Sequence, residues 1–244
     1  MVNTSLPTTH WSLVRAAGGE LSEESRRRAL ADVLRTYLPA MRAHLLIKLR
    51  IPAGDTEDLL QGFVADKVLE HEVFRSADQA KGRFRNFLLT ALDRYVFDQH
   101  RWSGAQKRGG GETRVPIEEA ALVAVAVGAG PDQAFDVAWA RQVLAEAVEV
   151  MREQCRAGAR PDLWDVFESR VLQSTIGGGR PVPYGELVIR HGWKTPAQAS
   201  NALVTAKRMF VRVLRSVIGR YESEEVNIDR EIQELYRVMA RTEE

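Results

Sequence analysis

The chain has little of what secretion, disulfide frameworks or membranes require. It contains one cysteine, Cys155, so no disulfide forms within the chain, which is typical of a reducing compartment. The segment from Met1 to Trp11 is polar and lacks the apolar core of a signal peptide. No stretch approaches the roughly 20 apolar residues of a membrane span. These absences predict a cytoplasmic protein with no membrane insertion.

The residue patterns of common enzymes are also missing. The histidines are scattered without metal-ligand spacing. The glycines from Gly109 to Gly111 are not followed by the Lys-Ser/Thr pair of a phosphate loop. Neighbouring acids such as Glu57 and Asp58 do not share a helix face, so they do not form a catalytic pair. We therefore expect no catalytic residue, no metal and no cofactor, and predict that the protein is not an enzyme.

The apolar residues follow a helical period. Strand-type alternation persists nowhere, whereas apolar residues recur at steps of three and four almost throughout. This spacing predicts an all-α fold. Three helices are expected in the N-terminal part, with stripes that include Leu34, Phe63 and Leu88. Pro52 and Gly54 are expected to end the first helix, and Asp55 to cap the second.

Glycine and proline gather where the chain is expected to divide. The Gly-rich stretch 105–131 predicts a flexible linker between two small helical domains. The expected segments are an N-terminal segment 1–25, a first helical domain 26–104, the linker 105–131, a second helical domain 132–221 and a C-terminal acidic helical tail 222–244.

The second domain ends in a pattern typical of a helix-turn-helix. A short helix over 184–191 is followed by Gly192, which suits a left-handed helix end. Thr195 is expected to cap the next helix, with Pro196 at its first position. Gln198 stands three residues after the cap, which is capping-box spacing. We expect this second helix to run from Pro196 to about Tyr221.

The charge around this motif is one-sided. Between Arg190 and Tyr221 there are seven cations and no acid, a pattern that favours binding of phosphate. In a helix-turn-helix the start of the second helix enters the major groove, so its polar residues are candidates for contact with bases. The alternative is a helical hairpin with a solvated basic face. The candidate DNA-binding residues are Lys194, Thr195, Gln198, Ser200, Asn201, Thr205, Lys207, Arg208 and Arg212.

A second basic stretch runs from Lys81 to Arg108 and holds seven cations against two acids. Three of its aromatic residues fall on the apolar stripe and are expected in the core. Phe97 and Trp102 lie at the basic end of the stretch, where they are candidates for stacking on unpaired bases. The alternative is that these two rings cap a hydrophobic core.

The tail from Glu222 to Glu244 has eight acids against three arginines. Its apolar residues form a helical stripe, so we expect an acidic helix docked on the protein's own helices. A free, solvated tail is the alternative. A docked acidic helix directly after a basic one is expected to temper the binding of DNA or of a protein partner, partly by charge. The stripe consists of Ile228, Ile232, Leu235, Tyr236 and Met239.

Two segments carry a resemblance to a known family. GDTEDLLQGFVADKVL resembles the acidic D-x-E-D-L-x-Q-x-F helix in region 2 of bacterial RNA polymerase sigma factors of the extracytoplasmic-function type. KGRFRNFLLTALDRYVFDQHRWSGAQKRGGG resembles the basic, aromatic segment that follows it in the family, and the helix-turn-helix resembles region 4. The resemblance covers about residues 30 to 220 in the right order. It is closest to a divergent branch with an N-terminal TTHWSLV segment, extended here at the C-terminus.

The resemblance implies a two-domain sigma factor that directs transcription initiation with core RNA polymerase. The acidic helix would bind the polymerase through Asp55, Glu57, Asp58 and Gln61. The helix-turn-helix would bind the double-stranded −35 element, and the first domain would bind the −10 element, including its single-stranded form. An anti-sigma factor or another regulator would be a further partner. The residues implied at the −10 element are Arg83, Arg85, Arg94, Phe97, Arg101, Trp102, Lys107 and Arg108.

Two other functions stay open at this point. One is a transcription regulator that uses the helix-turn-helix without polymerase. The other is a sigma-derived module for signalling or protein interaction. The acidic helix over 55–63 favours the sigma factor, because a plain repressor does not need a polymerase-docking surface.

Overall fold

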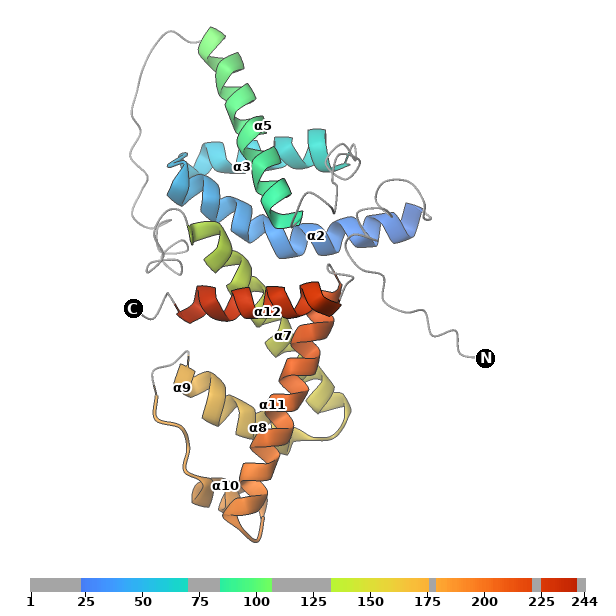
Figure 1. Ribbon diagram of the computed structural model, residues 1–244, viewed down its shortest axis with the longest axis vertical. Coiled ribbons are helices and arrows are strands. Elements are labelled where there is room, and N and C mark those ends of the chain that lie inside the picture. The colour runs from blue at the N-terminus through green and yellow to red at the C-terminus, as the bar shows by residue number, and fades with distance from the viewer. Residues whose placement is uncertain (1–22, 70–83, 107–132, 176–178, 221–224, 241–244) are drawn as a thin grey trace. The chain divides into compact units, whose positions relative to one another are not determined.

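The computed structural model describes residues 23–69, 84–106, 133–175, 179–220 and 225–240 (Figure 1). Within these ranges every regular element is helical and no strand occurs, which confirms the all-α prediction. The predicted segment 1–25 and linker 105–131 lie almost wholly outside the described residues. None of the described helices is both long enough and apolar enough to span a bilayer.

Two compact units make up the chain. One contains the described residues of Met1–Gln142 and Ile218–Glu244, and the other consists of Val143–Val217. This division differs from the segments expected from sequence, which placed residues 132–221 in one domain and treated 222–244 as a separate tail. The first turns of the helix that begins at Ala134 and the whole C-terminal helix belong to the first unit.

The first unit is built on three helical segments that pack around one core. They are α2 (Glu23–Ala43), which continues as a π-helical turn over His44–Lys48; α3 (Ala53–Phe63), which continues similarly over Val64–Leu69; and α5 (Phe84–Gln106). Tyr37, Leu45, Phe63, Leu88 and Leu92 are among the side chains that are fully or almost fully buried between them. The apolar stripes therefore point inward as the periodicity predicts.

The start of α3 differs from the expectation. Asp55 is not the N-cap: the helix begins at Ala53 after Pro52, and the Thr56 N–H donates to the Pro52 carbonyl at 2.9 Å. Proline is well tolerated at the start of a helix, because the backbone N–H that it lacks would have no partner within the helix there. Asp55 lies exposed in the first turn, where its charge still complements the helix N-terminus.

A close approach of α3 and α5 depends on Gly62. A Cβ at this position would collide with the Tyr95 hydroxyl. That hydroxyl donates a hydrogen bond of 3.0 Å to the Asp66 carboxylate, and its ring packs edge-on against Phe63. Burial, followed by the bond to Asp66, raises the pKa of Tyr95 above its ordinary value. The absence of a side chain at Gly62 therefore allows α3 and α5 to pack this closely.

The second unit contains most of α7 (Ala134–Ala157), then α8 (Pro161–Phe167) with a π-helical turn over Glu168–Leu172, and α9 (Gln173–Thr175). It ends with α10 (Tyr184–His191) and α11 (Pro196–Gly219), whose last residues belong to the first unit. Its core includes Met151, Phe167 and Leu214, and Cys155 is also buried. Burial raises the pKa of the Cys155 thiol above its ordinary value.

The C-terminal helix α12 (Glu225–Ala240) is docked, as predicted. Leu235 and Val238 are buried, whereas Tyr236, which was expected on the buried stripe, is 55% exposed. The stripe is therefore rotated relative to the predicted one. Glu231 is also buried.

Candidate nucleic-acid interface

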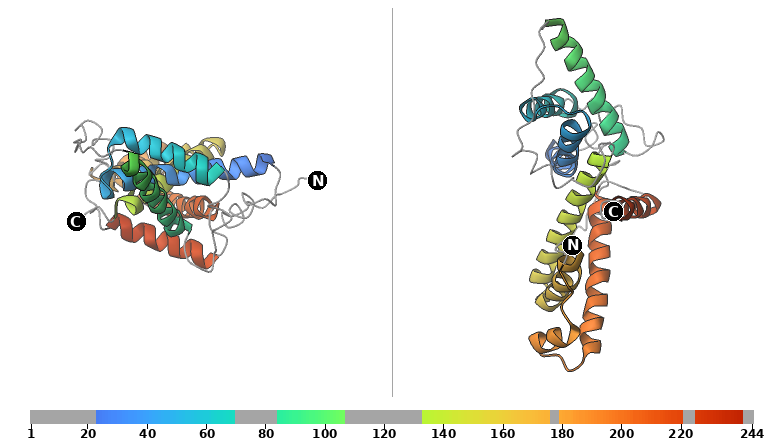
Figure 2. Two further views of the ribbon diagram at one scale, coloured as in Figure 1. Left: turned by 90° about the horizontal axis from the view of Figure 1, so that it is seen from above. Right: turned by 90° about the vertical axis from the view of Figure 1, so that its left-hand side faces the viewer.

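The turn between α10 and α11 is held by glycine. Gly192 has a φ of 65°, in the left-handed region that the sequence predicts for it. The Gly192 N–H donates to the Ile189 carbonyl at 3.3 Å, and the Trp193 N–H to the Val188 carbonyl at 2.9 Å. These two bonds form a Schellman motif, which ends α10 and redirects the chain into α11. Figure 2 shows α11 leaving this turn as one continuous helix.

The start of α11 is fastened by Gln198. Its side-chain oxygen accepts hydrogen bonds from the backbone N–H of Lys194 at 2.6 Å and of Thr195 at 3.3 Å. The predicted capping-box role of Gln198 is therefore confirmed. The same bonds occupy its acceptor oxygen, so only the side-chain NH₂ group is available to a ligand.

One face of α11 is exposed along its first three turns, and we call it the recognition face. Its members recur at the helical steps that bring side chains to one side. Ser200 is only half-buried beside this face, and the alanines and leucine of the opposite side are buried. The recognition face consists of Ala197, Gln198, Asn201, Val204, Thr205 and Arg208.

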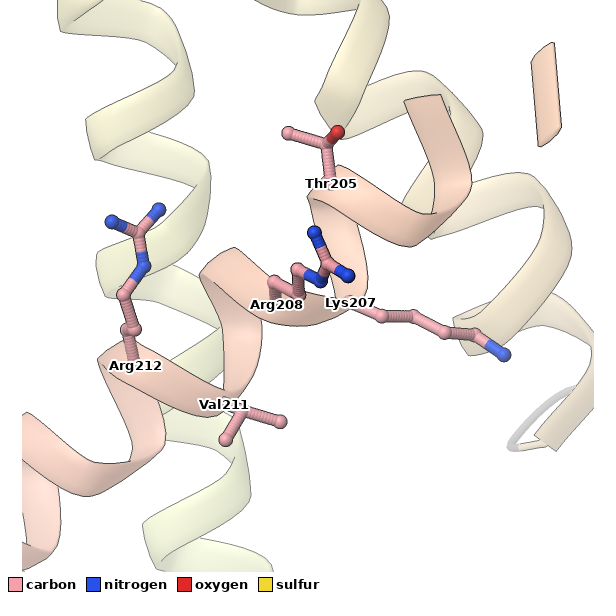
Figure 3. A pocket seen from close by; sticks show the side chains of 5 residues that line it. All are labelled: Thr205, Lys207, Arg208, Val211 and Arg212. Carbon is pink, nitrogen blue, oxygen red and sulfur yellow. The ribbon is translucent and has the colours of Figure 1, made fainter. Parts of the chain in front are cut away.

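Cations continue along α11 beyond the recognition face. Lys207, Arg208 and Arg212, with Thr205 and Val211, line a shallow hollow (Figure 3). Within the described part of the chain, no carboxylate forms an ion pair with any of these three cations. Their charges are therefore available to an external anion. Lys194 is exposed at the turn and adds a further positive charge.

Arg190 does not belong to this group of available cations. Its guanidinium lies 2.9 Å from the Asp165 carboxylate and 2.7 Å from that of Glu186. The charge of Asp165 and these hydrogen bonds raise the pKa of Arg190 above its ordinary value. His191 lies 2.7 Å from the same Asp165, so both residues fasten α10 to α8. The count of seven cations therefore overstates the free positive charge.

A second candidate surface lies on the C-terminal half of α5. Arg94, Phe97 and Arg101 follow one another at helical spacing and are exposed, and Phe97 is 62% exposed. The Arg101 guanidinium lies 6.0 Å from the centre of the Phe97 ring. Arg94 and Phe97 also line a shallow hollow together with Asp93 and Asp98. Phe97 therefore does not cap a core, and the alternative interpretation of this ring is wrong.

Four other residues implied at the −10 element cannot be placed. Arg83, Lys107 and Arg108 lie outside the described residues, and the side chain of Trp102 does too.

Arg85 corrects the sequence-based assignment. It is buried, at 4% exposure, and its Nη1 lies 3.3 Å from the Glu231 carboxylate on α12. Its guanidinium stacks over the Trp139 ring at 4.5 Å from the ring centre, and Asp136 is 3.8 Å from its Nε. A buried guanidinium that is already paired does not reach DNA. Arg85 is therefore a structural residue that binds α12 and the start of α7.

The acidic helix presents a narrow polar stripe. Asp55, Asp58 and Gln61 are exposed on α3 at steps of three residues, so they share one face. Glu57 lies to the side and pairs with Arg42 at 2.5 Å. Three of the four residues expected to bind core polymerase are thus brought together without an internal partner among the described residues.

Two exposed apolar residues of α11 were not among the site residues predicted from the sequence. Val204, on the recognition face, is 43% exposed, and Val211, between Arg208 and Arg212, is 41% exposed. The helical period contained a signal for Val204, because it falls three residues after Asn201 and three before Lys207 and so shares their side of the helix. The described residues contain no cluster of three or more His, Cys, Asp or Glu side chains arranged to hold a metal ion.

Comparison of the chain with family models, curated proteins and solved structures gives no match.

Proposed function

We propose that the protein is a sigma factor of the extracytoplasmic-function type, which binds core RNA polymerase and directs it to promoters. The observation that carries the proposal is the α10–α11 helix-turn-helix with its exposed recognition face and available cations. Phosphate binding needs cations that are not already neutralised, and Lys207, Arg208 and Arg212 meet that condition. On this proposal α11 binds the duplex at the −35 element.

The second part of the proposal concerns α5. An aromatic ring that is exposed beside arginines suits unpaired bases, because every base offers a face for stacking. Phe97, with Arg94 and Arg101, supplies this combination. We assign these three residues to the opened −10 element.

The third part is the polymerase contact. A DNA-binding protein does not need an exposed acidic stripe, since that stripe repels phosphate. Asp55, Asp58 and Gln61 are therefore assigned to a protein partner, core polymerase. This stripe separates the sigma factor from a helix-turn-helix regulator that acts without polymerase.

A pull-down with core polymerase tests the polymerase contact. Reversing both charges, Asp55→Arg with Asp58→Arg, should strongly weaken binding. Glu57 is left unchanged, because its pair with Arg42 would confuse the result. The control reverses two exposed acids of α7, Glu149→Arg with Glu153→Arg. It also breaks their surface ion pairs with Arg152 and Arg156, so it covers the loss of such pairs as well, and it should bind as the unaltered protein does. Equal binding by a folded Asp55/Asp58 variant would contradict the proposal.

Salt dependence tests the phosphate contacts of α11. Each of Lys207→Ala and Arg208→Ala should weaken binding to all duplexes alike and reduce the slope of log K against log salt by about one. A slope that neither substitution changes would remove these residues from the interface. If the chain binds neither core polymerase nor DNA, the function proposed here is wrong as a whole.

A further inference from the structure

The recognition face of α11 separates residues that the sequence treats as equivalent. Gln198, Asn201 and Thr205 all carry hydrogen-bonding groups, and each is exposed. They differ in how much of that capacity the protein already uses. This difference indicates which base each of them can bind, on the condition that the proposed function holds.

Gln198 and Thr205 already use part of their hydrogen-bonding capacity within the protein. The side-chain oxygen of Gln198 accepts the backbone N–H groups of Lys194 and Thr195, so it is not available to a base donor. The hydroxyl of Thr205 donates to the Asn201 carbonyl at 2.9 Å, so its proton is used. A paired contact with adenine needs both a donor and an acceptor from one side chain. Neither residue offers both.

Asn201 keeps both groups. No hydrogen bond of its side-chain amide occurs among the described residues, and the residue is exposed at the centre of the recognition face. Its oxygen and its NH₂ group are therefore available together. An amide with both groups available matches the N6 donor and N7 acceptor of adenine in the major groove.

Apolar groups flank Asn201. Val204 is 43% exposed and lies one turn after Asn201. Thr205 also lies one turn after Asn201, and its methyl group remains for apolar contact, because its hydroxyl donates to the Asn201 carbonyl. In the major groove the group that suits an apolar side chain is the C5-methyl of thymine.

We infer that the recognition face reads A·T pairs: Asn201 binds an adenine edge, and Val204, helped by the Thr205 methyl, contacts a thymine methyl. Val204 is thus a specificity-determining residue, although its side chain makes no hydrogen bond. Arg208, one turn further along, contacts phosphate at the end of the same stretch.

The experiment starts with the full chain and a randomised duplex pool, from which the preferred site is selected. Each thymine of that site is then replaced singly by deoxyuridine, which removes only the methyl group. Each adenine is replaced singly by 7-deazaadenine, which removes the N7 acceptor. Affinities are measured for the unaltered protein and for Asn201→Ala, Val204→Ala and Val211→Ala.

Deoxyuridine at one position should lower the affinity of the unaltered protein about fourfold, the loss expected for one buried methyl. Val204→Ala should abolish that loss. Val211→Ala is the matched control, because it makes the same change at a residue of similar exposure two turns further along, and the loss should persist. At one adenine, 7-deazaadenine should cost about fivefold or more, and Asn201→Ala should abolish this cost.

Three results would overturn the inference. Deoxyuridine without effect at every thymine, in a protein that still selects a sequence, would remove the methyl contact while the proposed DNA binding stands. A deoxyuridine loss that vanishes in Val211→Ala but persists in Val204→Ala would reject the assignment to Val204. Failure to select any sequence would contradict both the inference and the DNA-binding part of the proposed function.

Discussion

Arg85 and Arg208 stand in similar basic stretches, yet the protein uses them in opposite ways. Arg85 lies under α12, paired with Glu231 and stacked on Trp139. Arg208 projects from α11 into solvent, with no ion pair among the described residues. The first guanidinium links α5 to α12 and to the start of α7, and the second is available to an external anion. A count of cations in a sequence therefore does not measure an interface, because position on the helix decides where each charge points.

The largest effect is expected where the buried pair is broken. Glu231→Ala leaves the Arg85 charge buried without its closest partner, and should lower the free energy of unfolding by about 3–5 kcal/mol. The matched control on the same helix is Arg237→Ala, which breaks the exposed pair with Glu234 and should cost less than about 1 kcal/mol. Urea unfolding measures both.

If Glu231→Ala lowers the free energy of unfolding as little as Arg237→Ala does, water or another anion replaces Glu231 as the partner of Arg85. The structural role of the Arg85–Glu231 pair would then be refuted. A paired replacement, Arg85→Leu with Glu231→Leu, sharpens the result. It should recover most of the loss, since two apolar side chains avoid the cost of burying charges.

A second effect is expected in the core of the first unit. Gly62→Ala places a methyl group against the Tyr95 hydroxyl and should destabilise the protein by about 1–3 kcal/mol. Gly54→Ala, in the same helix but with open space around it, should stabilise by a few tenths of a kcal/mol to about 1 kcal/mol. Thermal unfolding distinguishes the two substitutions, and equal melting temperatures would argue against the close approach of α3 and α5.

The third effect belongs to the turn of the second unit. Gly192→Ala forces a residue with a Cβ to keep a φ of 65° and should cost about 1–2 kcal/mol. Gly185→Ala lies in α10 with open space around it, so it should not destabilise the protein. DNA binding should weaken in Gly192→Ala but not in Gly185→Ala, because only Gly192 lies in the turn that sets the direction of α11. Unchanged unfolding of Gly192→Ala would mean that the turn adapts without strain.

The smallest effect concerns the charge of α12. The hypothesis that this helix tempers DNA binding stays a prediction. Removing the tail also removes Glu231, so truncation mixes electrostatics with stability. Neutralising the surface instead, by Asp229→Asn with Glu234→Gln, should raise DNA affinity by up to about fivefold at low salt. The gain should disappear at high salt. A gain that is independent of salt, or a loss, would show that charge is not how α12 acts.

The sequence predicted well what depends on local geometry. The helical class, the bounds of α10 and the left-handed Gly192 follow from periodicity, capping and the absence of a Cβ. The Asp55 cap failed because Pro52 competes for the same role three residues earlier. The tail stripe missed Val238 and included Tyr236, since a short helix with apolar residues on several sides has no unique buried face.

The buried position of Arg85 could have been predicted from the helical period of the sequence, but its ion-pair partner could not. It stands three residues before Leu88 and seven before Leu92, so it falls on the buried stripe of α5. Its partner, however, lies 146 residues away in the sequence. No local rule identifies such a partner. The exposed state of Phe97 was equally undecided, because an aromatic residue near a helix end suits both a core and a surface.

Run-off transcription decides whether the chain acts as a sigma factor. Core polymerase is supplied with fragments that contain the selected site, with and without the full chain, and transcript starts are mapped. We expect transcripts to start at a fixed distance downstream of the site only when the chain is present. We also expect Phe97→Ala to retain duplex binding but to lose most transcription, because opening of the −10 element needs the exposed ring. Site-specific DNA binding without any dependent transcript would contradict the sigma factor and leave a regulator that acts without polymerase.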